Sequence, residues 1–182
     1  LNSITKLATD SVKTIGATTG HGEWPNKNLQ DLARVLGEYY YVERVPVDST
    51  AGPLSRFAAL IVAGPQQGFS EYEKFLLDQY IMQGGKIVWL LDGVSVSMDS
   101  LRTHRSTFGI ANELNLQDML FHYGVRINYD LVIDQQCLPV GLTRMAASGQ
   151  PQIELFPWPY HPLLHASQAQ NPITRYLNPV RT

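Results

Sequence analysis

The sequence predicts an α/β fold in which helices cover both faces of a mostly parallel β-sheet. Before residue 135, short apolar runs alternate with longer amphipathic ones, as strands and helices do in such folds. The runs at 58–63 and 86–92 are apolar along their length, which is typical of central parallel strands buried on both faces. Together these observations indicate a doubly wound, three-layer architecture.

The first third of the chain predicts a strand, a loop, a helix and two more strands. Residues 12–17 form a short β-prone run, and the turn-like residues 18–23 follow it. Residues 28–39 place apolar side chains at helical spacing. Residues 40–47 are rich in β-branched and aromatic side chains, and 58–63 is a buried strand that ends before a Gly-Pro pair.

A capping box predicts the start of the next helix. Ser70 is a good N-cap and Glu73 stands three residues later, so each side chain can satisfy a backbone N–H of the first turn. The glycines at 84 and 85 are expected to end this helix. The helical spacing predicts four inward-facing side chains, Phe75, Leu76, Tyr80 and Ile81.

Three further elements complete this part of the prediction. Residues 86–92 form another buried strand, after which a polar loop extends to about residue 112. A helix is expected at 114–123. The apolar run 131–133 is expected to be the last strand of the sheet.

The last quarter of the chain differs in composition. Residues 135–182 hold seven of the 11 prolines and only four charged side chains. Proline removes a backbone donor and interrupts helices and central strands, so we expect this part to be extended and rich in loops. The whole chain, 1–182, is predicted to be a single domain, with 135–182 as its extended C-terminal part.

Charge and cysteine content exclude several classes of function. The chain has 14 Lys and Arg against 16 Asp and Glu and no basic block, so nucleic acid is not expected as a partner. The single cysteine, Cys137, excludes an internal disulfide framework and a cysteine-based zinc cluster. No apolar run reaches 18 residues. Because the chain begins Leu-Asn-Ser and has no obvious ending, we interpret it as a fragment of a longer protein.

Ligands of doubly wound folds bind at the carboxyl ends of the strands, beside the point where strand order reverses. Four polar loops are predicted at this edge, which we call the rim: residues 18–23, 64–68, 92–97 and 134–137. The candidate ligand or partner contacts on the rim are Thr19, His21, Glu23, Gln66, Asp92 and Asp134.

The loop 18–23 is the most informative of the four. Gly20 and Gly22 allow tight turns, and His21 and Glu23 bring an imidazole and a carboxylate to the rim. These side chains either act as a base pair or ligand contacts, or they stabilise the turn, with Glu23 near the positive end of the next helix. We favour the structural role, because no second His or Cys stands at metal-ligand spacing. The glycine pattern matches neither a dinucleotide-binding fingerprint nor a P-loop, so no NAD, ATP or zinc is expected.

Two aspartates and the cysteine are weaker candidates. Asp92 and Asp134 each end an apolar run, so they either meet across the rim or cap loop amides, and we favour capping. Cys137 lies outside any nucleophile elbow and is expected to be a small buried hydrophobic side chain. The other histidines share no metal-ligand spacing; they are His104, His122, His161 and His165.

The segment 156–164 combines prolines with large aromatic side chains. Its prolines forbid a regular helix or a central strand, whereas Trp158 and Tyr160 are residue types enriched at binding hot spots. The segment is therefore either an arm that packs on a partner subunit or a cover over the domain's own core. We favour the cover.

Several motifs occur in the same order as in a known family of transport proteins. They are Thr19-Gly20-His21-Gly22-Glu23, Leu60-Ile61-Val62-Ala63-Gly64-Pro65, the run from Asp78 to Lys86, Asn115-Leu116, Tyr123-Gly124-Val125-Arg126 and Phe156-Pro157-Trp158-Pro159-Tyr160. Through these motifs the chain resembles, over nearly its whole length, the GldG-type auxiliary subunits of gliding-motility ABC transporters.

The resemblance implies an extracytoplasmic (periplasmic) domain, anchored to the cytoplasmic membrane by transmembrane segments that this chain lacks. It implies an auxiliary or substrate-binding component that works with a separately encoded permease and ATPase, on a cargo or partner protein that it does not identify. The implied fold is class I glutamine amidotransferase-like, with a flavodoxin-like sheet. In the amidotransferases a cysteine nucleophile follows the corresponding strand, whereas Asp92 stands near that place here, so the domain is expected to be non-catalytic and to hold no cofactor.

The leading hypothesis is a non-enzymatic domain of an ABC transport system that binds a partner or ligand through the rim and the segment 156–164. One alternative is a hydrolase or deamidase-like enzyme using His21, Glu23 and Asp92, which requires these groups to converge on one substrate. The other is a structural scaffold linking the transporter to envelope machinery, which requires no ligand cleft.

Overall fold

The computed structural model describes residues 12–48, 53–96, 107–145, 150–164, 178 and 180–181. The chain divides into two compact units, residues 1–129 and 130–182, and each is described by itself below. That the chain is a single domain stays a prediction.

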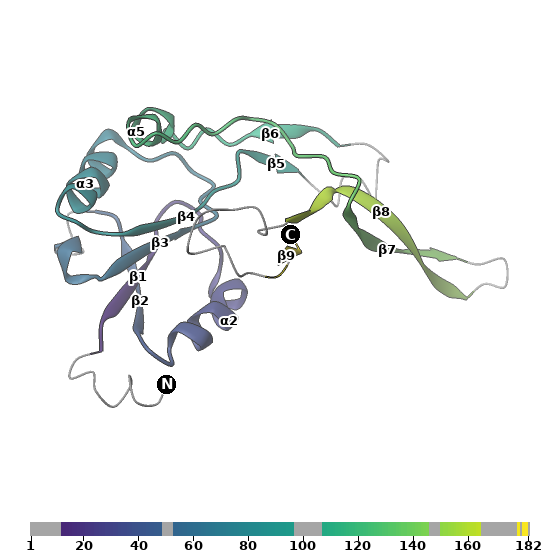
Figure 1. The fold of residues 1–182 in the computed structure, drawn as a ribbon, viewed down its shortest axis with the longest axis horizontal. Helices are drawn as coiled ribbons and strands as arrows, with labels where there is room; N and C mark the ends of the chain where they lie inside the picture. The colour runs from purple at the N-terminus through teal and green to yellow at the C-terminus, as the bar shows by residue number, and fades with distance from the viewer. Residues whose placement is uncertain are drawn as a thin grey trace. The chain divides into compact units, whose positions relative to one another are not determined.

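The first unit is built on a four-stranded parallel sheet of β1 (Thr14–Thr19), β2 (Tyr41–Pro46), β3 (Ala59–Ala63) and β4 (Ile87–Leu90). The strand order is β2-β1-β3-β4 (Figure 1). The two central strands, β1 and β3, are buried along most of their length, and their residues there are mainly small or branched. The chain moves outward from β1 in both directions, so strand order reverses between β1 and β3. The predicted α/β fold with a mostly parallel sheet is confirmed.

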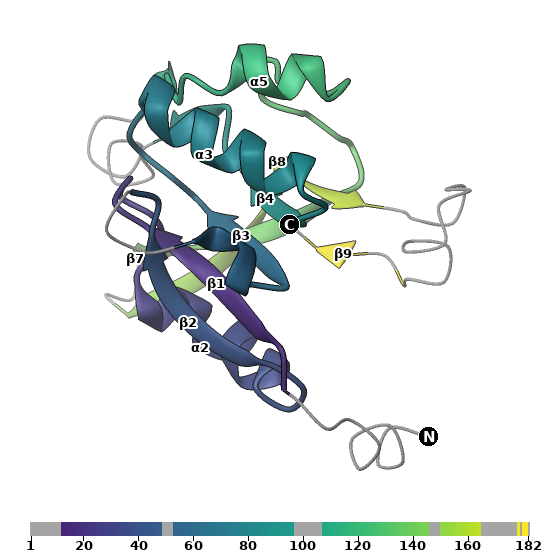
Figure 2. The same cartoon turned by 90° about the vertical axis from the view of Figure 1, so that its left-hand side faces the viewer.

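Helices cover both faces of this sheet. Figures 1 and 2 show α2 (Asn26–Leu36) on one face and α3 (Glu71–Met82) with α5 (Gln117–His122) on the other. On the α2 face, Leu29 packs with side chains of β1 and β3. On the opposite face, Leu77 and Leu120 belong to a larger cluster that includes Leu60 and Val62 of β3. The first unit therefore has the three layers that the sequence predicts.

Helix α3 begins with the predicted capping box. The Ser70 hydroxyl accepts a hydrogen bond from Glu73 N, and the Glu73 carboxylate accepts one from Ser70 N at 2.7 Å. The predicted inward face is wrong at Phe75, which is 56% exposed. The buried residues of α3 are Lys74, Leu77 and Tyr80, which follow one another at intervals of three and so share one face of the helix. Phe75 lies outside this face.

Strand β4 differs from its prediction. Its residues alternate between half-buried and exposed, with Val88 49% and Leu90 37% exposed, so the expectation of burial on both faces is wrong. β4 is the edge strand of this sheet, and α2 packs on β1 and β3. The face of β4 on the α2 side is therefore left uncovered by that helix. In the predicted polar loop, β5 (Val94–Val96) pairs antiparallel with β6 (Gly109–Ala111).

The second unit is a long antiparallel hairpin. β7 (Cys137–Met145) pairs with β8 (Pro151–Leu164), and β9 (Val180–Arg181) pairs with the end of β8. The register shifts between Cys137 and Pro139, opposite the proline-rich part of β8. The expectation that prolines keep 156–164 out of a central strand is wrong, because β8 lies between β7 and β9. β9 pairs with β8 at Leu163 and Leu164, beyond the prolines. The strand predicted at 131–133 is wrong, because these three residues are exposed and lie outside every strand of the described chain.

Candidate functional site

The loop that follows β1 turns inward rather than outward. Gly20 and Gly22 have φ of +118° and +72°, a region that glycine enters without steric cost. The turn places the side chains of His21 and Glu23 inside the unit, with His21 4% and Glu23 9% exposed. The half-buried Thr19, the last residue of β1, precedes this turn.

His21 is held by α3 and by the segment that precedes it. Its Nε2 lies 3.2 Å from Oε1 of Glu73, and because a carboxylate only accepts, this nitrogen is the donor. Its ring stacks on the buried Phe69, with centroids 3.8 Å apart and planes inclined by 15°. The imidazole therefore joins the β1–α2 loop to the start of α3.

Glu73 has two roles at once. Oε2 caps the helix by accepting from the N–H and the hydroxyl of Ser70, and Oε1 faces His21. Burial acts to raise the pKa of Glu73, but the hydrogen bonds from Ser70 and His21 outweigh burial, so its pKa is lowered. The sequence identifies Glu73 as a capping residue and gives no signal of its contact with His21, which is 52 positions earlier.

Glu23 completes the cluster from the other side of the imidazole. Its Oε2 accepts a hydrogen bond from His21 N at 2.8 Å, and its Oε1 lies 3.7 Å from Nδ1 of His21. Both of these facing atoms, Nδ1 and Oε1, are buried and lack a hydrogen-bond partner among the described residues. The imidazole ring thus lies between the carboxylates of Glu23 and Glu73.

The loop 64–68, which follows β3, packs against the first loop. The carbonyl of His21 accepts hydrogen bonds from Gln66 N and Gln67 N, at 2.7 and 3.0 Å. The side chain of Gln66 is exposed, and its amide donates back to the carbonyl of Gly64. Trp24 bonds Ala63 O and lies directly over Gly64, whose φ is +60°. Two of the four predicted rim loops, 18–23 and 64–68, therefore contact each other, and the contact is made by backbone hydrogen bonds.

Asp92 and Asp134 lie in different units. Asp92 is exposed just after β4, and its carbonyl accepts a hydrogen bond from the side chain of Asn112. The cavity that Asp92 helps to line measures about 10 Å³, which is at most the space of one water molecule. In the second unit, the Asp134 carboxylate accepts a hydrogen bond from Gln136 N at 3.0 Å, the capping geometry expected for a loop aspartate.

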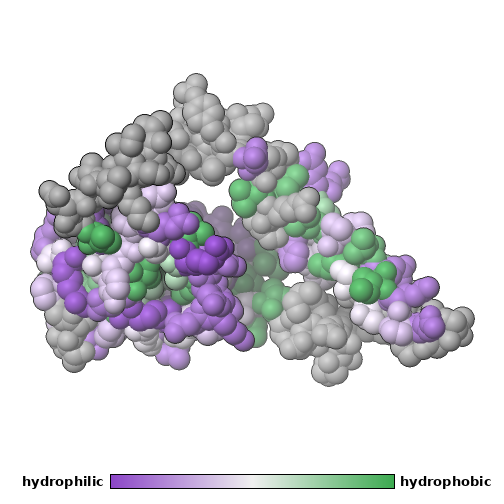
Figure 3. Space-filling model, turned by 90° about the horizontal axis from the view of Figure 1, so that it is seen from below, coloured by the Kyte–Doolittle hydropathy of each residue, from purple (hydrophilic) through white to green (hydrophobic). Residues whose placement is uncertain are grey.

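The aromatic pair of β8 is partly exposed. Trp158 is half-buried and Tyr160 is 43% exposed, with ring centroids 5.5 Å apart and planes inclined by 57°. Hydrophobic residues gather along this hairpin (Figure 3), among them Ile153 and Leu155, which are 74% and 66% exposed. The thiol of Cys137, at the start of β7, is free and half-buried. The hairpin thus presents exposed apolar side chains both before and after its proline-rich part in the sequence.

No metal cluster and no membrane span occur in the part of the chain that the structure describes. No group of three His, Cys, Asp or Glu side chains there has the arrangement that a metal ion needs. No helix of those same residues combines the length and apolar character that crossing a bilayer requires. His104 and His165 lie outside the described residues.

A second polar cluster, which the sequence analysis did not identify, links α3 to α5. Nζ of the buried Lys74 lies 2.8 Å from Asp118 and 2.9 Å from Glu71. Hydrogen bonds with Lys74 are the main cause of the lowered pKa of Asp118. Because Asp118 is 44 positions from Lys74, no local pattern in the sequence could reveal the pair.

Comparison with known proteins identifies one family. The family model for auxiliary components of an ABC-type uncharacterized transport system matches residues 12–182. No curated protein matches the chain. Among solved structures, the mmIFT52 N-terminal domain is similar, with 20% sequence identity and a TM-score of 0.53; the match covers 80% of this chain and 66% of that one. At this identity the likeness concerns the fold alone.

Proposed function

Because the chain belongs to the ABC transporter auxiliary family, we propose that it is a non-catalytic, extracytoplasmic auxiliary domain of such a system. In this proposal the system is of the GldG type and is linked to gliding motility, the fold is a relative of the glutamine amidotransferase layer, and the partners are a permease and an ATPase. The observation that carries the proposal is the extent of the family match, which runs from residue 12 to residue 182.

The burial of the histidine–carboxylate cluster supports a non-catalytic role. A general base must come within hydrogen-bond reach of a substrate proton. His21 is 4% exposed, one face of its ring is covered by Phe69, and Nε2 is bound to Glu73. A substrate could reach this imidazole only after the β1–α2 loop had left α3. The cluster is therefore better suited to fixing the loop than to chemistry.

We propose that the β7–β8 hairpin contacts the membrane-embedded permease. Trp158 and Tyr160 are residue types that dominate binding energy at interfaces, and Tyr160 is 43% exposed. Proline holds the segment extended before any partner arrives, which lowers the entropy lost on binding. This assignment adopts the arm alternative for 156–164, whereas the sequence alone favoured a cover over the domain's own core. Substrate binding by the rim is the other part of the proposal.

Co-purification from the native membrane tests this role. We expect the full-length protein carrying Trp158→Ala to recover less than a tenth of the permease and ATPase that the unchanged protein recovers, at an unchanged melting temperature. Phe108→Ala is the matched control, because Phe108 is an aromatic residue that is 84% exposed and lies in the first unit, outside the hairpin. Equal recovery by both variants and the unchanged protein would remove the hairpin from the interface, and failure of the unchanged protein to recover either subunit would refute the transport role.

The location is tested with the single cysteine. A membrane-impermeant maleimide should label Cys137 in intact spheroplasts as fully as in lysed ones, and Cys137→Ser should abolish this labelling. Labelling that requires lysis would place the domain in the cytoplasm and refute the extracytoplasmic proposal.

A further inference from the structure

The largest cavity that we describe lies at the edge of the sheet opposite the rim. It has a volume of about 720 Å³ and is bounded by the amino ends of β1, β3 and β4. The 3₁₀ helix η1 (Leu54–Arg56) and the turn between α3 and β4 form its other walls. Sites for metabolite-sized ligands have volumes of about 300–1,000 Å³, so this cavity has a suitable size.

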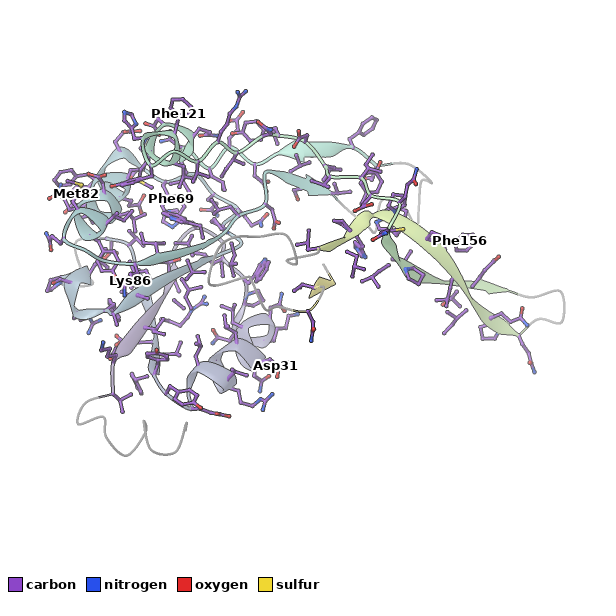
Figure 4. All side chains as sticks on the ribbon, viewed as in Figure 1. Asp31, Phe69, Met82, Lys86, Phe121 and Phe156 are labelled. Atoms are coloured by element: carbon purple, nitrogen blue, oxygen red, sulfur yellow. The ribbon has the colours of Figure 1, made fainter. Side chains whose placement is uncertain are left out.

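Three cationic side chains line this cavity, and no carboxylate is among its described lining residues. Lys13 precedes β1, Arg56 ends η1, and Lys86 precedes β4; Figure 4 labels Lys86 at that end of the sheet. The three charges come from separate parts of the chain, so no local sequence pattern shows that they converge. Three positive charges around one concavity attract an anion.

Only one of the three cations has a carboxylate partner within the described residues. Arg56 bonds Glu43 at 2.8 Å, and Glu43 does not line the cavity. The guanidinium also lies 4.5 Å from the centre of the Phe57 ring, which fixes its plane. A guanidinium has five donors, so Arg56 retains donors after this ion pair. Lys13 and Lys86 form no ion pair with any described residue.

Uncharged groups complete the lining. Tyr40 and Ser55 bring hydroxyls and Gln83 an amide, which suit the hydroxyl groups of a ligand. The floor is formed in part by Tyr80, which is 4% exposed and donates to Phe57 O at 3.0 Å. This bond fixes the ring of Tyr80 beneath the cavity.

The two glycines between α3 and β4 bring the chain close to this floor. Gly84 has φ of +88°, and Gly85 has no room for a side chain, because a Cβ there would lie 2.4 Å from the Tyr80 ring. Lys86 follows at once. The glycine pair, which the sequence pattern marks only as the end of a helix, thus also positions one of the three cations.

The carboxyl end of α3 acts against anion binding. A helix carries a partial charge of about −0.5 at that end, which is screened by solvent at an open edge. The three full positive charges of the lining, offset by the single carboxylate of Glu43, exceed that partial charge several times over. The balance of charge at the cavity is therefore positive.

We propose that this cavity binds a small molecule bearing a phosphate group, with the phosphate between Lys13, Arg56 and Lys86. Arginine and lysine together bind phosphate oxygens well, since the guanidinium supplies paired donors and the ammonium groups supply charge. The remaining part of the ligand lies against Tyr40 and Gln83. The ligand is either a soluble phosphate ester or a lipid headgroup, which share this chemistry. The proposal rests on the cavity alone, so its failure would leave the transport role standing.

Calorimetry on the full chain tests the site with glycerol 3-phosphate and pyrophosphate as soluble probes. Vesicles of phosphatidylglycerol, compared with vesicles of phosphatidylcholine, form a second arm. We expect saturable 1:1 binding of a soluble probe, or binding to the anionic vesicles alone if the source is a lipid. The double variant Lys13→Gln/Lys86→Gln should weaken that binding at least tenfold.

The control has the same loss of charge elsewhere on the first unit. Lys27→Gln/Arg126→Gln changes two exposed cations that lie outside the cavity and should leave the affinity within twofold. Equal weakening by both double variants would mean a general charge effect and overturn the site. Absence of binding to both soluble probes and to both kinds of vesicle would overturn it as well. Circular dichroism confirms that each variant keeps its fold.

Discussion

His21 is predicted to stabilise the fold rather than to act on a substrate, and His21→Ala tests this directly. The substitution removes the hydrogen bond to Glu73 and the stack on Phe69. A hydrogen bond to a charged group contributes about 1.5–3 kcal/mol, and an aromatic pair contributes about 0.5–1.5 kcal/mol. We therefore expect the free energy of unfolding to fall by about 3 kcal/mol.

The loss is measured by urea unfolding and by thermal melting. For a chain of this length, 1 kcal/mol corresponds to about 2–4 °C, so the melting temperature should fall by about 6–12 °C. His122→Ala is the matched control, because His122 is exposed and its ring bonds the carbonyl of Asp118 in its own helix, so the free energy of unfolding should change by less than about 1 kcal/mol.

A second variant separates the two contributions. His21→Phe keeps a ring against Phe69 but cannot donate to Glu73, so it should lose only the hydrogen-bond part, about 1.5–3 kcal/mol. When Glu73→Gln is added to the His21→Phe protein, the free energy of unfolding should then fall by less than it does when Glu73→Gln is made in the unchanged protein. A His21→Phe protein as stable as the unchanged one would refute the argument, because the bond to Glu73 would then contribute nothing.

Two further predictions concern other contacts of the first unit. Gly64→Ala should destabilise the protein by at least about 2 kcal/mol more than Gly84→Ala does. Both glycines have positive φ, but only at Gly64 would a Cβ meet another group, the indole of Trp24; urea unfolding gives the difference, and equal losses would contradict it. The hydrogen bond to Asp78 raises the pKa of Tyr123 to about 12. A phenol whose pKa is higher in the folded state stabilises that state below pH 10 and loses this effect as the pH rises toward 12, so Asp78→Asn should return the ultraviolet titration of Tyr123 toward 10; an unchanged titration would exclude that contact.

The elements of the sheet could be predicted from the sequence, because their signals are local. Apolar runs mark β1, β3 and β4, and Ser70 with Glu73 marks the start of α3. Local signals fail where a distant partner decides the outcome. Lys74 is buried because Asp118 neutralises it, and this leaves Phe75 on the exposed side of α3.

The strand predicted at 131–133 fails for a related reason. Three consecutive apolar residues satisfy the local preference for extended structure, but a strand exists only where another strand bonds to it. Residues 131–133 lie outside the strands of the described chain, and the next backbone bond is made by Asp134 N to Pro159 O within the hairpin. The sequence pattern shows which residues can extend and not which neighbour will pair with them.

Ligand binding at the rim stays a prediction, and the structure adds a cavity at the opposite edge of the sheet that the sequence did not indicate. Strand order reverses between β1 and β3, so the general rule for doubly wound folds places a ligand at their carboxyl ends. In this chain the turn at Gly20 and Gly22 directs His21 inward, its carbonyl ties the two loops together, and Trp24 lies over Gly64.

Backbone bonds and the buried ring of His21 thus hold these two loops together. The amino ends of the same strands carry cations from three elements around a volume of about 720 Å³. Like charges around a concave surface repel one another, which destabilises the empty cavity, and a bound anion would reduce this repulsion. If the double variant at Lys13 and Lys86 proves more stable than the unchanged protein at low salt, the three cations repel one another in the empty cavity; an equal or lower stability would contradict this repulsion.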